Sequence, residues 1–350
     1  MMHAPLHDNK MWTTAEINDL ATIVARTDFL AFRRQIRPHM LVGWWIEEVA
    51  DHLQQFYDEM MDGKRPKLAI AAPPQHGKSW AATDFIAYVS GRNPERKTIF
   101  GSYSDDLGVR TNNELQRIFT SEPFRKIFPK TRIAEEGATG GYDRWKRNSS
   151  LIEFVGYPGS FRNTTVAGPI NGMELHLGVI DDPLKGRAEA HSPTMRNKTW
   201  DWFADDFLSR FAKDAALLCV MTRWHVDDIL GRYIEKIHDD IRVLRYPAIA
   251  EMDELHRRKG EALFASTLAY IAHYEYDIQY RQNTQEGAMN DSMPPKLDPD
   301  ADTKRINMMA PISWLRKIDD WRRQQPDLPN ISEAIRRLVD AGLEATSKKG

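Results

Sequence analysis

The chain has 350 residues, of which 41% are hydrophobic and 28% are charged, with a formal net charge of -2. This composition is typical of a folded protein and excludes wholesale disorder. The near-neutral charge means that any contact with nucleic acid depends on local patches. The single cysteine, Cys219, excludes an intramolecular disulfide and a multi-cysteine metal site.

The N-terminus has no apolar core of the kind found in signal peptides. No apolar stretch approaches the roughly 20 residues that span a bilayer. We therefore expect a cytoplasmic protein without membrane contact.

Helical spacing dominates the N-terminal region, residues 1–62. Thr13 or Thr14 can cap a helix that begins near Ala15. A second helix is expected from Trp44 to the residues before Gly63. Its apolar positions fall at helical spacing: Trp45, Ile46, Val49, Leu53, Phe56 and Met60.

Short apolar strands alternate with helices over residues 63–250. The predicted strands are 67–72, 98–103, 151–155, 175–180, 215–222 and 241–246. The predicted helices are 80–90, 105–119, 200–211 and 227–238. This alternation predicts an α/β fold in which a doubly wound, mostly parallel sheet is covered on both faces.

Composition changes after this core. Residues 251–303 become charged, aromatic and then rich in proline, which is typical of a linker. A compact segment is expected over residues 304–345.

Residues 72–79 (APPQHGKS) have the spacing of a Walker A loop, with Ala72 in place of the usual first glycine. Such a loop surrounds nucleotide phosphates with backbone N–H groups at the positive end of a helix. The residues expected to surround the phosphates are Pro74, Gln75, His76 and Gly77. Lys78 would neutralise the β- and γ-phosphates, and Ser79 would offer its hydroxyl to Mg²⁺. The alternative is a chance Gly-Lys-Ser at a helix start.

The predicted strand 175–180 ends in Asp181 and Asp182, as in a Walker B motif. Asp181 would hold Mg²⁺, directly or through water, and Asp182 would orient or deprotonate the attacking water. An acidic turn after a strand is common by itself. Roughly a hundred residues after a Walker A loop, it favours a P-loop NTPase that uses ATP and Mg²⁺.

The predicted strand 215–222 ends in Thr222, and Arg223 follows it. In phosphate-driven motors such a strand end senses the γ-phosphate, and we count both residues as catalytic candidates. A strand end followed by a solvated arginine is an equally good interpretation of the spacing.

These motifs together resemble the ATPase domain of the large terminase subunit of tailed bacteriophages, the motor that pumps DNA into the prohead. The resemblance covers residues 30–284. The segments that carry it are APPQHGKS (72–79), SYSDDLG (102–108), VAGPING (166–172), LGVIDDPLKG (177–186), MTRWHVDDILG (221–231) and YPAIAE (246–251).

The resemblance assigns Lys78 and Ser79 to Walker A, Asp181 to the metal and Asp182 to catalysis. It places Thr222 in the motif that couples hydrolysis to DNA movement. It also implies an ATPase in the host cytoplasm, assembled as a homo-oligomer, with double-stranded DNA, the portal protein and the small terminase subunit as partners.

The sequence departs from the family pattern in two ways. Many members carry an arginine where Gln75 stands, which turns attention to Arg223, Arg162 or an arginine of a neighbouring subunit. Large terminases also continue into a nuclease domain, whereas only 66 residues follow Thr284 here. We therefore expect no nuclease activity.

Residues 304–345 read as strand, helix, break and helix, and they resemble a ribbon-helix-helix domain. In that fold two chains pair their strands into a ribbon that enters the major groove. Arg305, Asn307 and Met309 share the strand face that would meet the bases. Between residues 301 and 350 there are 10 Lys and Arg against 7 Asp and Glu. A helical dimerisation tail without DNA contact is the alternative.

Two other functions remain open for the whole chain. One is a DNA-binding adaptor or regulator that keeps a relict prophage ATPase core. The other is a different P-loop motor such as a helicase, although no convincing set of further helicase motifs is found. The intact lysine, serine and paired aspartates favour the packaging motor.

Overall fold

The computed structural model describes residues 13–135, 145–170, 172–237 and 240–263, together with Trp321 and Arg337. The chain divides into two compact units, residues 1–247 and 248–350. In the second unit, a bridge between Ile249 and Ala262 closes the described segment. All elements discussed below belong to the first unit.

Three helices open the first unit: α1 (Thr14–Ala25), α2 (Phe29–Ile36) and α3 (Trp44–Met61). Thr13, one of the two predicted cap residues, caps α1, and it forms a capping box with Glu16. The apolar positions predicted for α3 are all buried. Gly63 follows α3 with φ of 73°, a conformation that glycine adopts at little cost, so the helix ends where expected.

A seven-stranded sheet with the order β3-β4-β2-β5-β6-β1-β7 forms the centre of the unit. Its strands are β1 (Lys67–Ala71), β2 (Lys97–Ser102), β3 (Leu151–Glu153), β4 (Ser160–Thr165), β5 (Leu175–Asp181), β6 (Phe211–Met221) and β7 (Arg242–Arg245). The β3–β4 pair is antiparallel, and the other neighbouring pairs are parallel. This confirms the predicted mostly parallel α/β sheet.

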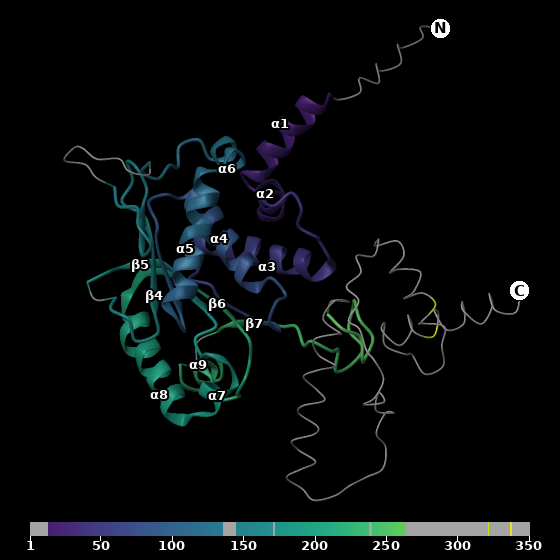
Figure 1. Cartoon of the computed structure of the whole chain (residues 1–350), viewed down its shortest axis with the longest axis vertical. Helices are drawn as coiled ribbons and strands as arrows, with labels where there is room; N and C mark the ends of the chain where they lie inside the picture. The colour runs from purple at the N-terminus through teal and green to yellow at the C-terminus, as the bar shows by residue number, and fades with distance from the viewer. Residues whose placement is uncertain are drawn as a thin grey trace, which may run out of the picture. The chain divides into compact units, whose positions relative to one another are not determined.

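The helices between the strands form two groups (Figure 1). They are α4 (Lys78–Arg92), α5 (Asp105–Thr120), α6 (Glu122–Ile127), α7 (Gly186–His191), α8 (Pro193–Asp201) and α9 (Ile229–Lys236). The chain moves one way along the sheet from β1 to β2 and then β4, and the opposite way from β5 to β6 and then β7. Right-handed crossovers therefore place α4 and α5 on one face and α7 to α9 on the other.

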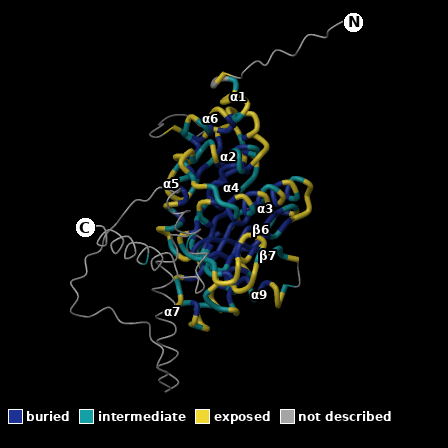
Figure 2. Tube along the Cα trace, turned by 90° about the vertical axis from the view of Figure 1, so that its right-hand side faces the viewer, coloured by how far each residue is buried: buried dark blue, intermediate teal, exposed yellow. Residues whose placement is uncertain are grey.

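Each face of the sheet has its own apolar core. On the face of α3 to α5, aromatic rings of Phe29, Phe85 and Tyr88 contact one another edge to face or tilted. On the other face, Trp202, Phe203 and Phe207 pack with residues of β6 and α9. Figure 2 shows the buried segments gathered in the strands and exposed ones along outer helices such as α1. Cys219 is buried in the core that contains Trp202, Phe203 and Phe207.

The helix predicted over residues 200–211 is wrong in its extent. Here α8 ends at Asp201, a π-helical turn covers Trp202–Phe207, and Leu208–Arg210 forms a 3-10 turn. The apolar spacing of these aromatic residues suits either kind of helix. Strand β6 then begins at Phe211, whereas the prediction began it at residue 215. The charged Lys213 and Asp214 interrupt the apolar pattern and hide the first residues of the strand.

Strand β4 and the short helices α6 to α8 were not predicted. Strand β4 (SFRNTT) is rich in polar residues, so its sequence lacks the apolar run of a buried strand. The buried Asn163 of this strand has a hydrogen-bonding partner in Asn112 of α5. Tertiary contacts therefore stabilise a strand that its own hydropathy does not indicate.

Several predictions fall outside the described residues. These are most of the linker 251–303, the ribbon-helix-helix segment 304–345 and its DNA-contacting residues Arg305, Asn307 and Met309. Among the helices that are described, none is both long and apolar enough to cross a membrane.

Candidate nucleotide-binding site

The carboxyl ends of the neighbouring strands β1 and β6 are the place where this topology favours a ligand site. We call the space between the segments that follow them, residues 72–79 and 222–231, the crevice. The two strands are parallel neighbours, and Ala71 pairs with Met221 at their carboxyl ends. The helices that follow them, α4 and α9, lie on opposite faces. In open α/β sheets ligands bind at such a reversal of strand order. The Walker A segment and Thr222 therefore leave the sheet side by side.

The loop between β1 and α4 is shaped by its backbone. Ala72 continues the strand, since its N–H donates to the Met221 carbonyl at 3.2 Å. It does not adopt a positive φ, so the conformation here does not require the usual glycine. Gln75 and Gly77 do adopt positive φ values, of 64° and 78°. For Gln75 this conformation is strained, a feature common at functional loops.

His76 holds this loop against helix α3. Its Nδ1 lies 2.8 Å from the Pro74 carbonyl oxygen, and because a carbonyl only accepts, Nδ1 is the donor. The buried imidazole also packs against the Trp45 ring in a T-shaped arrangement. The contact between His76 and Pro74 thus stabilises the shape of the predicted loop. Trp45 supports the loop as well, which the sequence motif did not reveal.

Lys78 joins the predicted phosphate-binding and catalytic residues into one cluster. Its Nζ lies 3.0 Å from Asp182 Oδ2 and donates to Thr222 Oγ1 at 3.0 Å. The lysine is only 4% exposed, so its ammonium is shielded from solvent, whereas the Asp182 side chain is 26% exposed. Residues from three separate motifs therefore meet at a single ammonium group.

Asp181 lies at the end of β5 beneath the start of α4. Its Oδ1 accepts a hydrogen bond from the Ser79 hydroxyl at 3.1 Å. Its Oδ2 is buried and has no hydrogen-bond partner in the described part of the chain. Burial raises the pKa of this carboxyl, and the neighbouring charge of Asp182 raises it further. A cation at Oδ2 would satisfy the orphaned oxygen, so Asp181 and Ser79 fit a Mg²⁺ site.

Asp182 connects three strands through its backbone and side chain. Its Oδ1 accepts from the Thr222 backbone N–H at 2.6 Å, and its own N–H donates to the Val220 carbonyl at 3.0 Å. Tyr103, at the end of β2, donates to the Asp182 carbonyl. The residue has φ of 41°, again a strained value for a non-glycine residue. These bonds fix the carboxylate beside Thr222.

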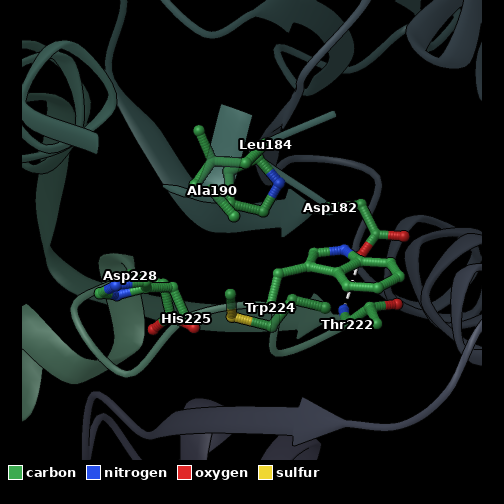
Figure 3. Close-up of a pocket in the computed structure, with 9 residues that line it drawn as sticks. Asp182, Leu184, Ala190, Thr222, Trp224, His225 and Asp228 are labelled. Carbon is green, nitrogen blue, oxygen red and sulfur yellow. Dashed lines mark hydrogen bonds between the residues drawn. The ribbon is translucent and has the colours of Figure 1, made fainter. Parts of the chain in front are cut away.

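A pocket adjoins Asp182 on the side of the β6–α9 loop (Figure 3). It is lined by Asp182, Pro183, Leu184, Ala190, Met221, Thr222, Trp224, His225 and Asp228. Its wall is mostly apolar, and Figure 3 shows the Trp224 indole near the Asp182 carboxylate with His225 and Asp228 farther along. The catalytic candidate therefore has an apolar neighbourhood on this side.

Arg223 is bound within its own loop. Its Nε pairs with Asp228, and its Nη2 donates to the Val226 carbonyl at 3.2 Å. The other intrachain candidate, Arg162, lies on β4, four places from β1 in the sheet. Since neighbouring strands are about 4.8 Å apart, β4 lies roughly 19 Å from β1. Neither arginine joins the cluster around Lys78.

The sequence did not reveal how the segment after β6 is held. Asp227 pairs with Arg196 of α8 at 2.9 Å and with Arg232 of α9 at 2.6 Å. Asp228 caps α9 by accepting from the Gly231 N–H at 2.9 Å. An Asp just before an apolar helix is a recognisable cap signal, so Asp228 was predictable in this role. The partnership with Arg196 depends on tertiary structure.

Comparison with known proteins connects this site to a family. The sequence profile described as "Terminase large subunit, T4likevirus-type, N-terminal" matches residues 69–284. The chain belongs to this family. The match includes both edges of the crevice, and the terminase subunit is accordingly an ATPase of the DNA-packaging motor type. This confirms the resemblance seen in the sequence.

Solved structures of large terminases are also similar to this chain. One is a mutant of the ATPase domain from Thermus phage P74-26, with 14% identity and a TM-score of 0.41, covering 61% of this chain and 86% of that one. Another is the large terminase of a thermophilic bacteriophage in complex with ATP-γ-S, with 12% identity and a TM-score of 0.33, covering 55% of this chain and 44% of that one. The match thus spans less than half of this second protein. No curated protein matches the chain in sequence.

Proposed function

We propose that this terminase subunit binds and hydrolyses ATP in the β1–β6 crevice and couples hydrolysis to the movement of double-stranded DNA. The observation that carries the proposal is the position of the Lys78 ammonium, 3.0 Å from both the Asp182 carboxylate and the Thr222 hydroxyl. The groups suited to bind phosphate (Lys78), activate water (Asp182) and sense the γ-phosphate (Thr222) thus lie in one cluster.

The triphosphate of ATP would occupy the loop formed by residues 73–79. Backbone N–H groups at the start of α4 face the phosphates, and Lys78 supplies the compensating charge. Arrival of the γ-phosphate gives the ammonium a second anion beside Asp182. The carboxylate, which shares that ammonium, is then available to orient or deprotonate the attacking water.

Ser79 and Asp181 are the residues that would hold Mg²⁺. The Ser79 hydroxyl and the unpartnered Asp181 Oδ2 are oxygen donors of the kind this ion prefers. When bound, Mg²⁺ neutralises the charge that develops on the phosphate oxygens.

Thr222 would pass the state of the site to the rest of the motor. The Asp182 carboxylate that handles water also accepts the Thr222 N–H. A change around this carboxylate therefore acts directly on the segment that leads into α9. We propose that this contact couples hydrolysis to DNA movement in a homo-oligomer, with the portal protein and small terminase subunit as partners in the host cytoplasm.

The decisive test is ATP hydrolysis by the full chain with and without double-stranded DNA. Asp182→Asn and Lys78→Ala should each lower turnover at least a hundredfold, and Asp182→Asn should still bind MgATP because Ser79 and Asp181 remain. Asp205→Asn, an exposed residue outside the crevice, is the matched control. Near wild-type turnover in Asp182→Asn would remove this carboxylate from the mechanism.

We also propose that residues 304–345 contact DNA as a ribbon-helix-helix segment, with Arg305, Asn307 and Met309 facing the bases. In the full chain, Arg305→Ala should reduce both affinity and sequence discrimination, whereas loss of a phosphate contact reduces affinity alone. Binding should also weaken with salt, with a slope of about -0.9 in log K per neutralised phosphate. Unchanged binding and discrimination in Arg305→Ala would contradict this arrangement.

A further inference from the structure

Trp80 directly follows the Walker A serine and has an exposed ring. It lies in the first turn of α4, and 59% of the residue is accessible to solvent. Large aromatic side chains normally bury most of their surface, so an exposed indole beside a ligand site needs a reason. The site as described above does not use this ring.

Arg37 fixes the ring in place. Its guanidinium carbon lies 4.7 Å from the centre of the Trp80 ring, in a cation–π arrangement. The same guanidinium bonds to Asp84 through Nε, at 2.8 and 2.9 Å, and to Glu114 through Nη1, at 3.1 Å. Asp84 is fully buried and also binds Arg33. The cation is thus held by α4 and α5 before any ligand arrives.

The other aromatic residues near the loop are less exposed than Trp80, and the partly buried Trp44 packs against Tyr246. Trp45 is 2% exposed and Tyr246 is 5% exposed, and their rings contact each other. Trp45 also meets His76. The Trp45 and Tyr246 rings cannot stack on a ligand without leaving the core, whereas more than half of Trp80 is accessible.

A nucleotide bound in the Walker A loop would have its base end toward this ring. Lys78 and Ser79 would receive the γ- and β-phosphates and the metal, and the loop N–H groups would also hold the α-phosphate. The N–H groups of the first helical turn have no intrahelical partners and face the phosphates. Trp80 belongs to that turn, so the sugar and base that follow the α-phosphate would lie beside its exposed side chain.

We infer that Trp80, held by Arg37, is the surface on which the base of the bound nucleotide stacks. This inference rests on the proposed ATP site and adds its base-binding and specificity-determining residue. Stacking engages the flat face of a base, which every base offers, rather than its hydrogen-bonding edge. Trp80 should therefore favour nucleotides with the larger purine bases over those with pyrimidines, and it should discriminate weakly between ATP and GTP.

The test compares two ligands that differ in the base and sugar. Equilibrium dissociation constants for MgATP and for magnesium tripolyphosphate are measured by calorimetry on the full chain. Trp80→Ala should weaken MgATP binding about tenfold or more, since stacking on an aromatic residue contributes about that much per base. Tripolyphosphate binding should change less than about twofold, and Trp80→Phe should keep most of the ATP affinity.

Two further variants complete the design. Trp145→Ala removes a tryptophan next to β3, outside the crevice, and should alter neither ligand. Arg37→Lys keeps the charge but loses the planar fork, and should weaken ATP more than tripolyphosphate. Because Trp80 is exposed, its substitution should not unfold the protein, which a thermal melt of each variant verifies.

The outcomes separate this inference from the proposed function. Equal weakening of both ligands in Trp80→Ala would overturn it, since the ring would then support the loop. Unchanged ATP affinity would also overturn it and leave the ring as a contact for another protein. If the wild type binds ATP through Trp80 but does not hydrolyse it, the proposed function fails while the base platform stands.

Discussion

The two edges of the crevice are built in different ways. The Walker A edge, residues 72–79, takes its shape from backbone conformation and from contacts within the loop, such as that between His76 and Pro74. The opposite edge, residues 222–231, is held by ion pairs that reach α8 and α9. A motif predicts the first edge well because its geometry is local. It does not predict the second edge, because the role of each charged residue there depends on which oppositely charged side chain the folded chain places beside it.

The largest effect on stability is expected at Gly231, and Gly77 on the opposite edge gives the comparison. A Cβ at Gly231 would lie 1.8 Å from the Val226 carbonyl oxygen, so Gly231→Ala should cost about 3 kcal/mol of unfolding free energy. A Cβ at Gly77 would meet nothing within 4 Å, and only its positive φ opposes alanine, at about 1–2 kcal/mol. Thermal unfolding of both variants measures the difference. A greater loss in Gly77→Ala would show that conformation outweighs space here.

Arg223 offers a sharper test of the second edge. Arg223→Met should destabilise the protein by about 2 kcal/mol, because it leaves the buried Asp228 without its cation. Asp228→Asn removes the same ion pair and keeps a capping side chain for α9. The two variants should therefore lower ATP turnover by similar factors. A loss of turnover a hundredfold larger in Arg223→Met than in Asp228→Asn would show that Arg223 acts on the phosphates.

Asp227 gives this edge a dependence on pH. Hydrogen bonds from Arg232 and Arg196 lower the pKa of Asp227, so its contribution is present above the unfolded value near 4 and is lost as pH falls through the folded value. The carboxylate is 39% exposed, so Asp227→Asn should cost about 1 kcal/mol or less at pH 7. The difference in melting temperature between wild type and variant should stay constant from pH 7 to 5 and should shrink as the pH falls below about 4. A gap that widens on acidification would contradict the ion-pair assignment.

The smallest effect is expected at Ala72. Ala72→Gly restores the usual Walker A residue, yet Ala72 does not have a positive φ and its N–H already donates to the Met221 carbonyl. ATP turnover should stay within about twofold of wild type, and stability should fall by less than about 1 kcal/mol through the greater freedom of glycine in the unfolded chain. A large gain in turnover would mean that alanine distorts the loop.

The sequence predicted much of the fold because apolar periodicity reports burial. The helix α3 and the strands β1, β2 and β5 were found in this way. The polar strand β4 was missed because its buried Asn163 depends on a partner from α5. The helix predicted over residues 200–211 began too late, because α8 starts at Pro193, and its aromatic part forms a π-helical and a 3-10 turn instead of a regular α-helix.

By itself, the sequence determined the family, the sheet-and-helix order and the residue types of the nucleotide site. The residue spacing within a loop or at a strand end constrains a short stretch of backbone, so a sequence motif can report that local structure. Only the tertiary structure decided that Lys78 meets both Asp182 and Thr222, that Arg223 binds Asp228, and that Trp80 keeps an exposed ring. The physical reason is that the partners of charged and aromatic side chains come from distant segments, which pack together only in the folded chain.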